Sequence, residues 1–285
     1  MYKIFFSFWL LSYSYAVYSD TVVWLYTDWP PHHILDGEHA GQGTFDQIQQ
    51  RLIAGLPQYQ HETRLTSVGR IEHLFAQSTQ TYCITGTLFS QERAAQRYYS
   101  VPMAVGAGYY INYLADSAIA EYLQLADHVD LVKLSTAGIW LGVYPPHRKY
   151  PPVIVEAFQQ ATAEWLSSEF NNEVNPVALL RNGRVDYILE YPERITYYQQ
   201  RLGAGSLVKT AAITGAEKHA VLHVTCTKTA LGQHLMDDIN QQLSVMWQQE
   251  DYQDLVFAWL TPEVRALLEP IFNEIRQRLS EKNRP

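Results

Sequence analysis

The stretch Tyr82-Cys-Ile-Thr-Gly-Thr-Leu-Phe-Ser-Gln-Glu-Arg93 joins a strand-like run to the start of a helix that carries an arginine in its first turn. Free backbone N–H groups gather at a helix start, so an anion is favoured near Arg93. A guanidinium can also hold a carboxylate through two parallel hydrogen bonds. We therefore expect Arg93 to bind a carboxylate, and a surface ion pair is the alternative.

Strands and helices alternate around this stretch. The apolar run at 22–26 indicates a buried strand, and Pro30 and Pro31 end it because proline cannot donate to a strand ladder. Thr44 and Gln47 have the spacing of a capping box, with Thr44 as the cap. The next expected elements are a helix from 44 to about 55, a strand at 61–66, a helix at 70–76 and a strand at 81–85. This order predicts an α/β lobe with a parallel sheet.

Two extended segments indicate a second lobe. Residues 107–115 predict the passage into it and residues 207–213 the return, so that two strands form a hinge. The second lobe is expected to hold strands at 140–143 and 185–191 and a helix at about 153–170. We assign residues 20–108 to the first lobe, 109–213 to the second lobe and 214–285 to the first lobe again.

The last third of the chain contains a strand at 220–225 and two helices. One face of the long helix that follows the strand is apolar; it carries Leu231, Leu235, Ile239, Leu243 and Met246. Thr261 is expected to cap the final helix, with Pro262 at its first position.

The first nineteen residues have the pattern of a signal peptide. One lysine precedes a short apolar run, and small residues follow. Cleavage after Ala16 and cleavage after Ser19 both fit this pattern, and a buried helix is the alternative. We expect export to the periplasm.

Charge and aromatic content indicate the kind of partner. The chain has 21 basic and 29 acidic residues, a net charge of −8, which argues against nucleic acid because phosphate binding requires basic surface. Its 20 Tyr and 7 Trp can stack on small organic ligands, although most are expected in the core.

Two cysteines are present, Cys83 and Cys226. An even number in an exported chain suggests one disulfide, which is possible if the strands at 81–85 and 220–225 are neighbours. Two buried thiols are the alternative.

The order of short motifs resembles that of bacterial periplasmic solute-binding proteins of the polar-amino-acid type. The resemblance rests on the stretch at 82–93, on Tyr99-Ser-Val-Pro102 and on Gly183-Arg-Val-Asp186, and it extends from Val22 to about Leu260. It implies a type II periplasmic-binding fold: two lobes, each an open, mostly parallel sheet flanked by helices, joined by a two-strand hinge. The resemblance also implies that the lobes close over a small ligand.

Four loops follow the carboxyl ends of the expected strands, where open α/β sheets bind ligands. In the first lobe, Trp29 can stack on a ligand or pack under its loop. Thr85 and Thr87 are implied by the resemblance to supply hydroxyls beside Arg93. Leu88 stands where the family pattern often has another hydroxyl.

In the second lobe, the resemblance implies an acid five residues after Asp186 that binds an amino group. That position is Tyr191, and the acid Glu190 precedes it. Neighbouring strand residues face opposite sides, so the direction of Glu190 stays open and both residues are candidates.

The loop Tyr144-Pro-Pro-His-Arg-Lys-Tyr-Pro-Pro152 lacks N–H donors at its four prolines. Tyr144 and His147 are candidate ligand contacts, and Arg148 and Lys149 add positive charge. A stiff solvated loop is the alternative.

We expect no metal site and no cofactor, because the histidines have no ligand spacing. We also expect no enzyme activity, since no nucleophile motif is present. The predicted function is capture of a small polar ligand, amino-acid-like or carboxylate-bearing, by a monomer that serves an ABC-type uptake system. The alternatives are a sensor that docks a membrane receptor and, less favoured, a dehydratase with Glu190 as general acid–base.

Overall fold

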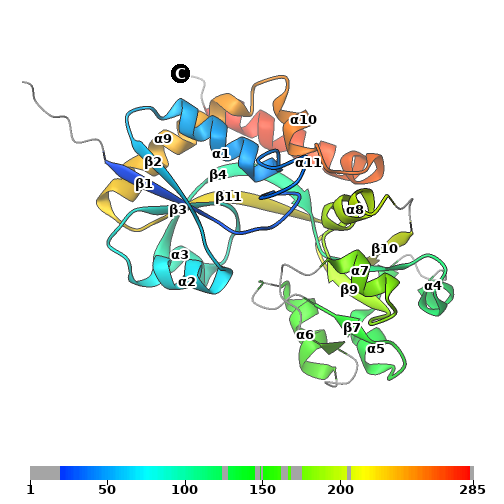
Figure 1. Cartoon of the computed structure of the whole chain (residues 1–285). Coiled ribbons are helices and arrows are strands. Elements are labelled where there is room, and N and C mark those ends of the chain that lie inside the picture. Colours follow the sequence, from blue (N-terminus) through cyan, green and yellow to red (C-terminus); the bar gives the residue numbers. More distant parts are fainter. Residues whose placement is uncertain are drawn as a thin grey trace, which may run out of the picture.

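The computed structural model describes residues 20–123, 128–144, 148, 150–161, 166–167, 175–203 and 207–282. These residues form two mixed sheets flanked by helices, one in each of two lobes (Figure 1). The two-lobe α/β fold predicted from the sequence is confirmed. The predicted signal peptide and His147 lie outside the described residues.

The first lobe has the strand order β2-β1-β3-β11-β4. Its strands are β1 (Thr21–Tyr26), β2 (Gln60–Leu65), β3 (Tyr82–Leu88), β4 (Arg97–Ala107) and β11 (His219–Thr227). Its helices are α1 (Thr44–Gly55), α2 (Val68–Gln77), α3 (Gln91–Gln96), α9 (Ala230–Met246), α10 (Tyr252–Val256) and α11 (Pro262–Lys282). β1 is parallel to β2 and β3, whereas β11 is antiparallel to β3 and β4.

The second lobe has the strand order β6-β10-β5-β9-β7-β8. Its strands are β5 (Tyr110–Leu114), β6 (His128–Val129), β7 (Gly142–Val143), β8 (Leu166–Ser167), β9 (Tyr187–Glu190) and β10 (Val208–Ile213). Its helices are α4 (Ala118–Leu123), α5 (Leu131–Thr136), α6 (Pro152–Gln160), α7 (Pro176–Arg181) and α8 (Pro192–Arg201). β5 is antiparallel to β9 and β10, so this sheet is mixed as well.

The alternation of side chains along β1 divides the first-lobe core into two layers. Val22 and Trp24 pack under α1, α9 and α11, and Val23 and Leu25 pack against α2 on the other face (Figure 1). The predicted apolar face of α9 is buried at Leu235, Ile239, Leu243 and Met246. No helix in the described part of the chain combines the length and apolar character needed to cross a membrane.

The two links between the lobes lie side by side. The chain leaves β4 through Gly108 and returns through 214–218, and the Gly108 N–H donates to Lys218 O at 2.9 Å. A Cβ atom at Gly108 would lie 2.1 Å from Glu217 O. Glycine is therefore needed where the two links approach each other.

Two local predictions are wrong. The cap of α1 is Gly43 rather than Thr44, because the Asp46 carboxylate accepts hydrogen bonds from the N–H groups of Gly43 and Ile34. The helix expected at about 153–170 ends at Gln160, because residues 166–167 pair with β7 as strand β8.

Cys83 and Cys226 form a disulfide between the neighbouring antiparallel strands β3 and β11, where they lie opposite each other. Both residues are fully buried. The bridge predicted from the sequence is confirmed.

Removing this disulfide should lower the free energy of unfolding by about 4–5 kcal/mol, because the bond closes a loop with a sequence separation of 143 residues. Denaturant unfolding of the oxidised protein and of a Cys83→Ser/Cys226→Ser double variant measures the difference. Two free thiols by mass spectrometry in oxidised protein, or equal stabilities, would contradict the prediction.

Candidate functional site

A cavity of about 120 Å³ lies between the lobes. This is about ten times the ~10–15 Å³ that one buried water needs, so a small organic solute fits. The first-lobe wall comes from the loop after β1, from the helices α1, α2 and α3 and from the strands β3, β4 and β11; the second lobe adds Tyr109, Arg148, Tyr191 and Glu193.

Aromatic rings form one side of the cavity. The ring centroid of Trp29 lies 6.0 Å from that of Tyr191 and 6.2 Å from that of Phe45, both edge-to-face. Two backbone hydrogen bonds between Trp29 and His33 hold the loop after β1. The buried indole Nε1 of Trp29 has no partner among the described residues. The rings thus offer stacking surface and one unused N–H donor.

Two arginines of the first lobe, Arg93 and Arg97, also line the cavity. Arg93 Nη2 lies 2.9 Å from Glu72 Oε1, and Arg97 Nη2 donates to Glu72 Oε2. Ser90 caps α3, because its side-chain oxygen accepts a hydrogen bond from the backbone N–H of Arg93. Burial lowers the pKa of Arg97, and the Glu72 carboxylate partly offsets this effect.

The threonines predicted as ligand contacts line the cavity but already have protein partners. Thr85 Oγ1 lies 3.2 Å from His33 Nε2, and Thr87 Oγ1 lies 3.0 Å from Thr225 Oγ1. Gly86 between them has a φ of +77°, and a Cβ atom there would lie 2.1 Å from the Phe45 ring. The strand end therefore approaches the aromatic wall closely.

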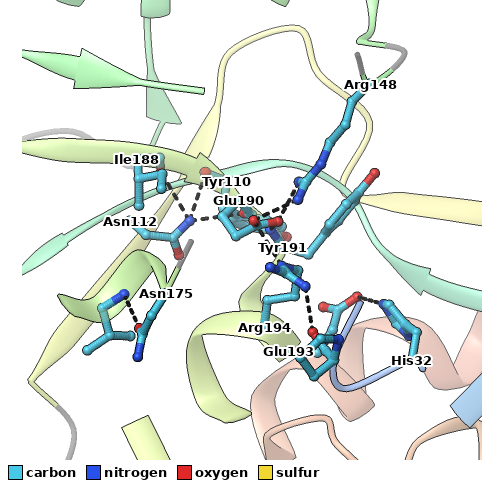
Figure 2. Close-up of polar contacts among 12 residues, drawn as sticks. His32, Tyr110, Asn112, Arg148, Asn175, Ile188, Glu190, Tyr191, Glu193 and Arg194 are labelled. Carbon is cyan, nitrogen blue, oxygen red and sulfur yellow. Dashed lines mark hydrogen bonds and ion pairs between the residues drawn. The ribbon is translucent and has the colours of Figure 1, made fainter. Parts of the chain in front are cut away.

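Glu190 lies behind the cavity wall in a buried cluster (Figure 2). Its carboxylate accepts two hydrogen bonds from Arg148, at 2.6 and 2.9 Å, and one from Arg194 Nε at 3.0 Å. A fourth donor is the Tyr191 N–H at 2.9 Å. Burial would raise the pKa of Glu190, but the two arginines outweigh it and hold this pKa below its ordinary value.

This cluster positions Arg148 in the cavity. The Arg148 guanidinium lies 5.5 Å from the ring centroids of both Trp29 and Tyr191. Burial by itself lowers the pKa of Arg148, and Glu190 reverses that effect and raises it above the ordinary value. Arg148 therefore stays charged between two aromatic faces.

The lobes also contact each other beside the cavity. Arg194 Nη1 donates to Pro30 O at 2.7 Å. His32 Nε2 lies 3.6 Å from Glu193 Oε1, and its ring stacks on Phe45 with centroids 4.3 Å apart. Figure 2 shows Arg194, Glu193 and His32 on the same side of Glu190. Burial lowers the pKa of His32, and Glu193 offsets part of the shift.

The predicted site residues fall into three groups. Five of them line the cavity: Trp29, Thr85, Thr87, Arg93 and Tyr191. Glu190 and Tyr144 do not; Glu190 is held by arginines, and the Tyr144 ring stacks on Phe158 with centroids 3.8 Å apart. His147 belongs to the undescribed part of the loop.

Sequence reasoning did not identify Glu72, Arg97 or Phe45 as wall residues. Arg97 is the first residue of β4, directly after α3, so no helical spacing from Arg93 indicated it. No spacing pattern indicated Glu72, because the arginines that it contacts belong to other elements. Within the described ranges, no group of three or more His, Cys, Asp or Glu side chains is arranged to hold a metal ion.

Comparison with known proteins adds the fold class. No protein-family model matches the chain, and no curated protein is similar to it in sequence. Solved structures are similar: a periplasmic binding protein of Salmonella typhimurium described for its high arginine specificity has 12% identity and a TM-score of 0.63, and covers 85% of this chain and 100% of its own.

Two further similar structures have other roles. A histidine kinase sensor domain with similarity to periplasmic binding proteins has 15% identity and a TM-score of 0.62, covering 85% of this chain and 96% of its own. An ancestral amino-acid-binding protein, a precursor of cyclohexadienyl dehydratase, has 17% identity and a TM-score of 0.63, covering 85% and 96%. At such identities the likeness establishes the two-lobe periplasmic-binding-protein fold.

Replacing Glu190 by Gln should destabilise the folded protein by about 3–5 kcal/mol at pH 7, because it leaves the buried Arg148 and Arg194 without a counter-charge. The difference should shrink as the pH falls below the ordinary Glu pKa of 4.5. The folded-state pKa is depressed, so the wild-type contribution is present above that value and is lost as the pH falls through the folded-state pKa.

Thermal unfolding of both proteins between pH 3 and pH 8 measures this effect. Glu121→Gln, at an exposed position, is the matched control. A Glu190→Gln variant as stable as the control at pH 7 would contradict the prediction.

Proposed function

We propose that the chain binds a small carboxylate-bearing solute in the cavity between its lobes, without chemical conversion. The observation that carries the proposal is that Arg93 and Arg97 line the same cavity as aromatic rings contributed by both lobes. Guanidinium groups favour carboxylates, and rings stack on the rest of the ligand. Hinge closure about the two links would bury the ligand, with Tyr191 contributing from the second lobe.

The arrangement of Glu190 speaks against the dehydratase alternative. A general acid must hold a proton near neutral pH and reach its substrate. Two arginines lower the pKa of Glu190, and its carboxylate does not border the cavity. Binding without catalysis is therefore the function that the site supports best.

Delivery to an ABC-type uptake system in the periplasm is our proposal for the biological role. It rests on the predicted signal peptide and on similar solved structures, one of which is the substrate-binding protein of an amino acid ABC transporter. The partners would then be the small ligand and a membrane permease, and the binding protein would act as a monomer.

A sensor that docks a membrane receptor is the second candidate. The specific observation is that buried contacts join the lobes beside the cavity, through Arg194 to Pro30 and His32 to Glu193. Uptake of the identified ligand in a deletion strain separates the two roles. Loss of uptake supports transport, whereas normal uptake with an altered transcriptional response to the ligand supports sensing.

A thermal-shift screen of small carboxylates against neutral analogues tests the binding proposal. A ligand that binds only the folded protein must raise its melting temperature. Arg93→Ala should weaken binding of such a hit by at least about tenfold, because a charge-assisted hydrogen bond contributes about 1.5–3 kcal/mol.

Arg70→Ala is the matched control, since Arg70 is exposed and lies outside the cavity wall. Calorimetric titration gives the affinities. Equal affinities of the two variants would show that Arg93 does not bind the ligand.

Trp29→Phe should remove the change in tryptophan fluorescence that ligand binding produces, because the Trp29 indole lines the cavity. Trp140→Phe is the control, since Trp140 packs near Tyr122 in the second lobe, away from the cavity wall. A full ligand-induced signal in the Trp29 variant would assign the change to another tryptophan.

A further inference from the structure

Glu72 occupies the place where the carboxylate of a ligand would bind. Its two oxygens contact different arginines: Oε1 lies 2.9 Å from Arg93 Nη2, and Oε2 accepts a hydrogen bond from Arg97 Nη2. All three side chains line the cavity between the lobes. One carboxylate thus bridges two guanidinium groups from within the protein.

The Arg97 guanidinium and the Arg93 backbone are held by contacts that do not involve Glu72. Arg97 is 2% exposed, and its guanidinium lies over the Phe75 ring, 4.2 Å from the centroid. Arg93 is 14% exposed and belongs to the first turn of α3, which Ser90 caps. Both arginines therefore keep their place on the cavity wall through burial, the Phe75 contact of Arg97 and the helix cap beside Arg93.

Glu72 is held less firmly. Its side chain on α2 is 40% exposed, and the two arginines are its only hydrogen-bond partners among the residues described. Its charge resembles that of a carboxylate ligand on a flexible stem of two methylene groups.

The arginines retain unused donors. The buried Nε atoms of Arg93 and Arg97 have no partner within the described ranges. A guanidinium has five N–H donors in a fixed fork, so each arginine can bind more than the single Glu72 oxygen that it holds.

We propose that Arg93 and Arg97 together form the anion subsite of the cavity and that Glu72 is its displaceable internal counter-ion. This proposal rests on the proposed function and names the group that the site recognises. The group is an oxyanion, such as a carboxylate, that can take hydrogen bonds from two guanidinium groups at once.

An internal counter-ion has two physical consequences. It neutralises two partly buried cations while the site is empty, which avoids the cost of leaving them unpaired. It also competes with the ligand at the high effective concentration of a tethered group. A neutral ligand gains nothing from displacing Glu72, so the competition selects for anions.

Chemical rescue tests the subsite without knowledge of the natural ligand. Glu72→Ala removes the terminal CH2–COO⁻ group of the side chain, and added propionate, a small carboxylate with one further methylene, should then stabilise the variant saturably at millimolar concentration. The uncharged isostere propionamide should not. Wild-type protein, whose site Glu72 occupies, should respond at least about fivefold less, and Glu62→Ala, which removes an exposed carboxylate from β2, should behave like the wild type.

Thermal unfolding at constant ionic strength and pH 7 is the measurement. Equal effects of propionate and propionamide on Glu72→Ala would overturn the anion subsite. An equal response of wild-type protein to propionate would also overturn it, since Glu72 would then not occupy the site.

A second measurement distinguishes displacement of Glu72 by the ligand from a role in which Glu72 only positions the arginines. Glu72→Gln should bind the best carboxylate from the screen about tenfold more tightly than wild type, because the competing charge is gone. If Glu72 instead only positions the arginines, the variant should bind more weakly, and this result would overturn the displacement.

The outcomes also distinguish this inference from the proposed function. Rescue by propionate with no carboxylate hit for either wild type or Glu72→Gln would refute solute binding and leave the anion subsite supported. Carboxylate hits without rescue would support solute binding and refute the two-arginine subsite.

Discussion

The buried Glu190 carboxylate is the interaction on which the second-lobe side of the site depends. It accepts hydrogen bonds from Arg148, Arg194 and the Tyr191 N–H, so it joins the loop after β7, the end of β9 and the start of α8. Arg194 then reaches Pro30 O in the first lobe. Removing one member of such a buried cluster leaves charges without partners, which costs more than the net gain from forming the pair. The wall is therefore fixed in position before any ligand enters.

The two acid–arginine clusters of the cavity differ in a way that indicates different roles. Glu190 is almost fully buried and has four donors, whereas Glu72 is 40% exposed and contacts two arginines. A fully satisfied buried carboxylate cannot leave its partners without desolvated charges remaining. Because Glu72 is 40% exposed, its carboxylate can be hydrated when an added anion takes its place on Arg93 and Arg97. The first cluster is thus structural, and the second can respond to an added anion.

Features encoded in short stretches of sequence could be predicted. The strand before Arg93 placed this residue on the cavity wall, and the period-2 alternation of a strand allowed Tyr191 and Glu190 to lie on different sides, as they do. The Cys83–Cys226 bridge followed from two expected neighbouring strands. The pairing of Glu72 with the arginines could not be predicted, because it joins separate elements and no spacing encodes it. The prediction of a helix beyond Gln160 is wrong because residues 166–167 pair with β7, and this pairing outweighed the local helical pattern.

The interlobe contacts bear on how a ligand would act on this fold. A ligand shifts the balance between open and closed lobes only by the difference in its affinity for the two states. Here the contacts of Arg194 with Pro30 and of His32 with Glu193 are made by the protein's own groups and contribute to closure. The more these contacts stabilise the closed state, the less of the ligand's binding free energy is needed for closure. The remainder is then measured as affinity. Exchange of Glu72 for the ligand anion at Arg93 and Arg97 then becomes the step at which an occupied cavity differs most from an empty one.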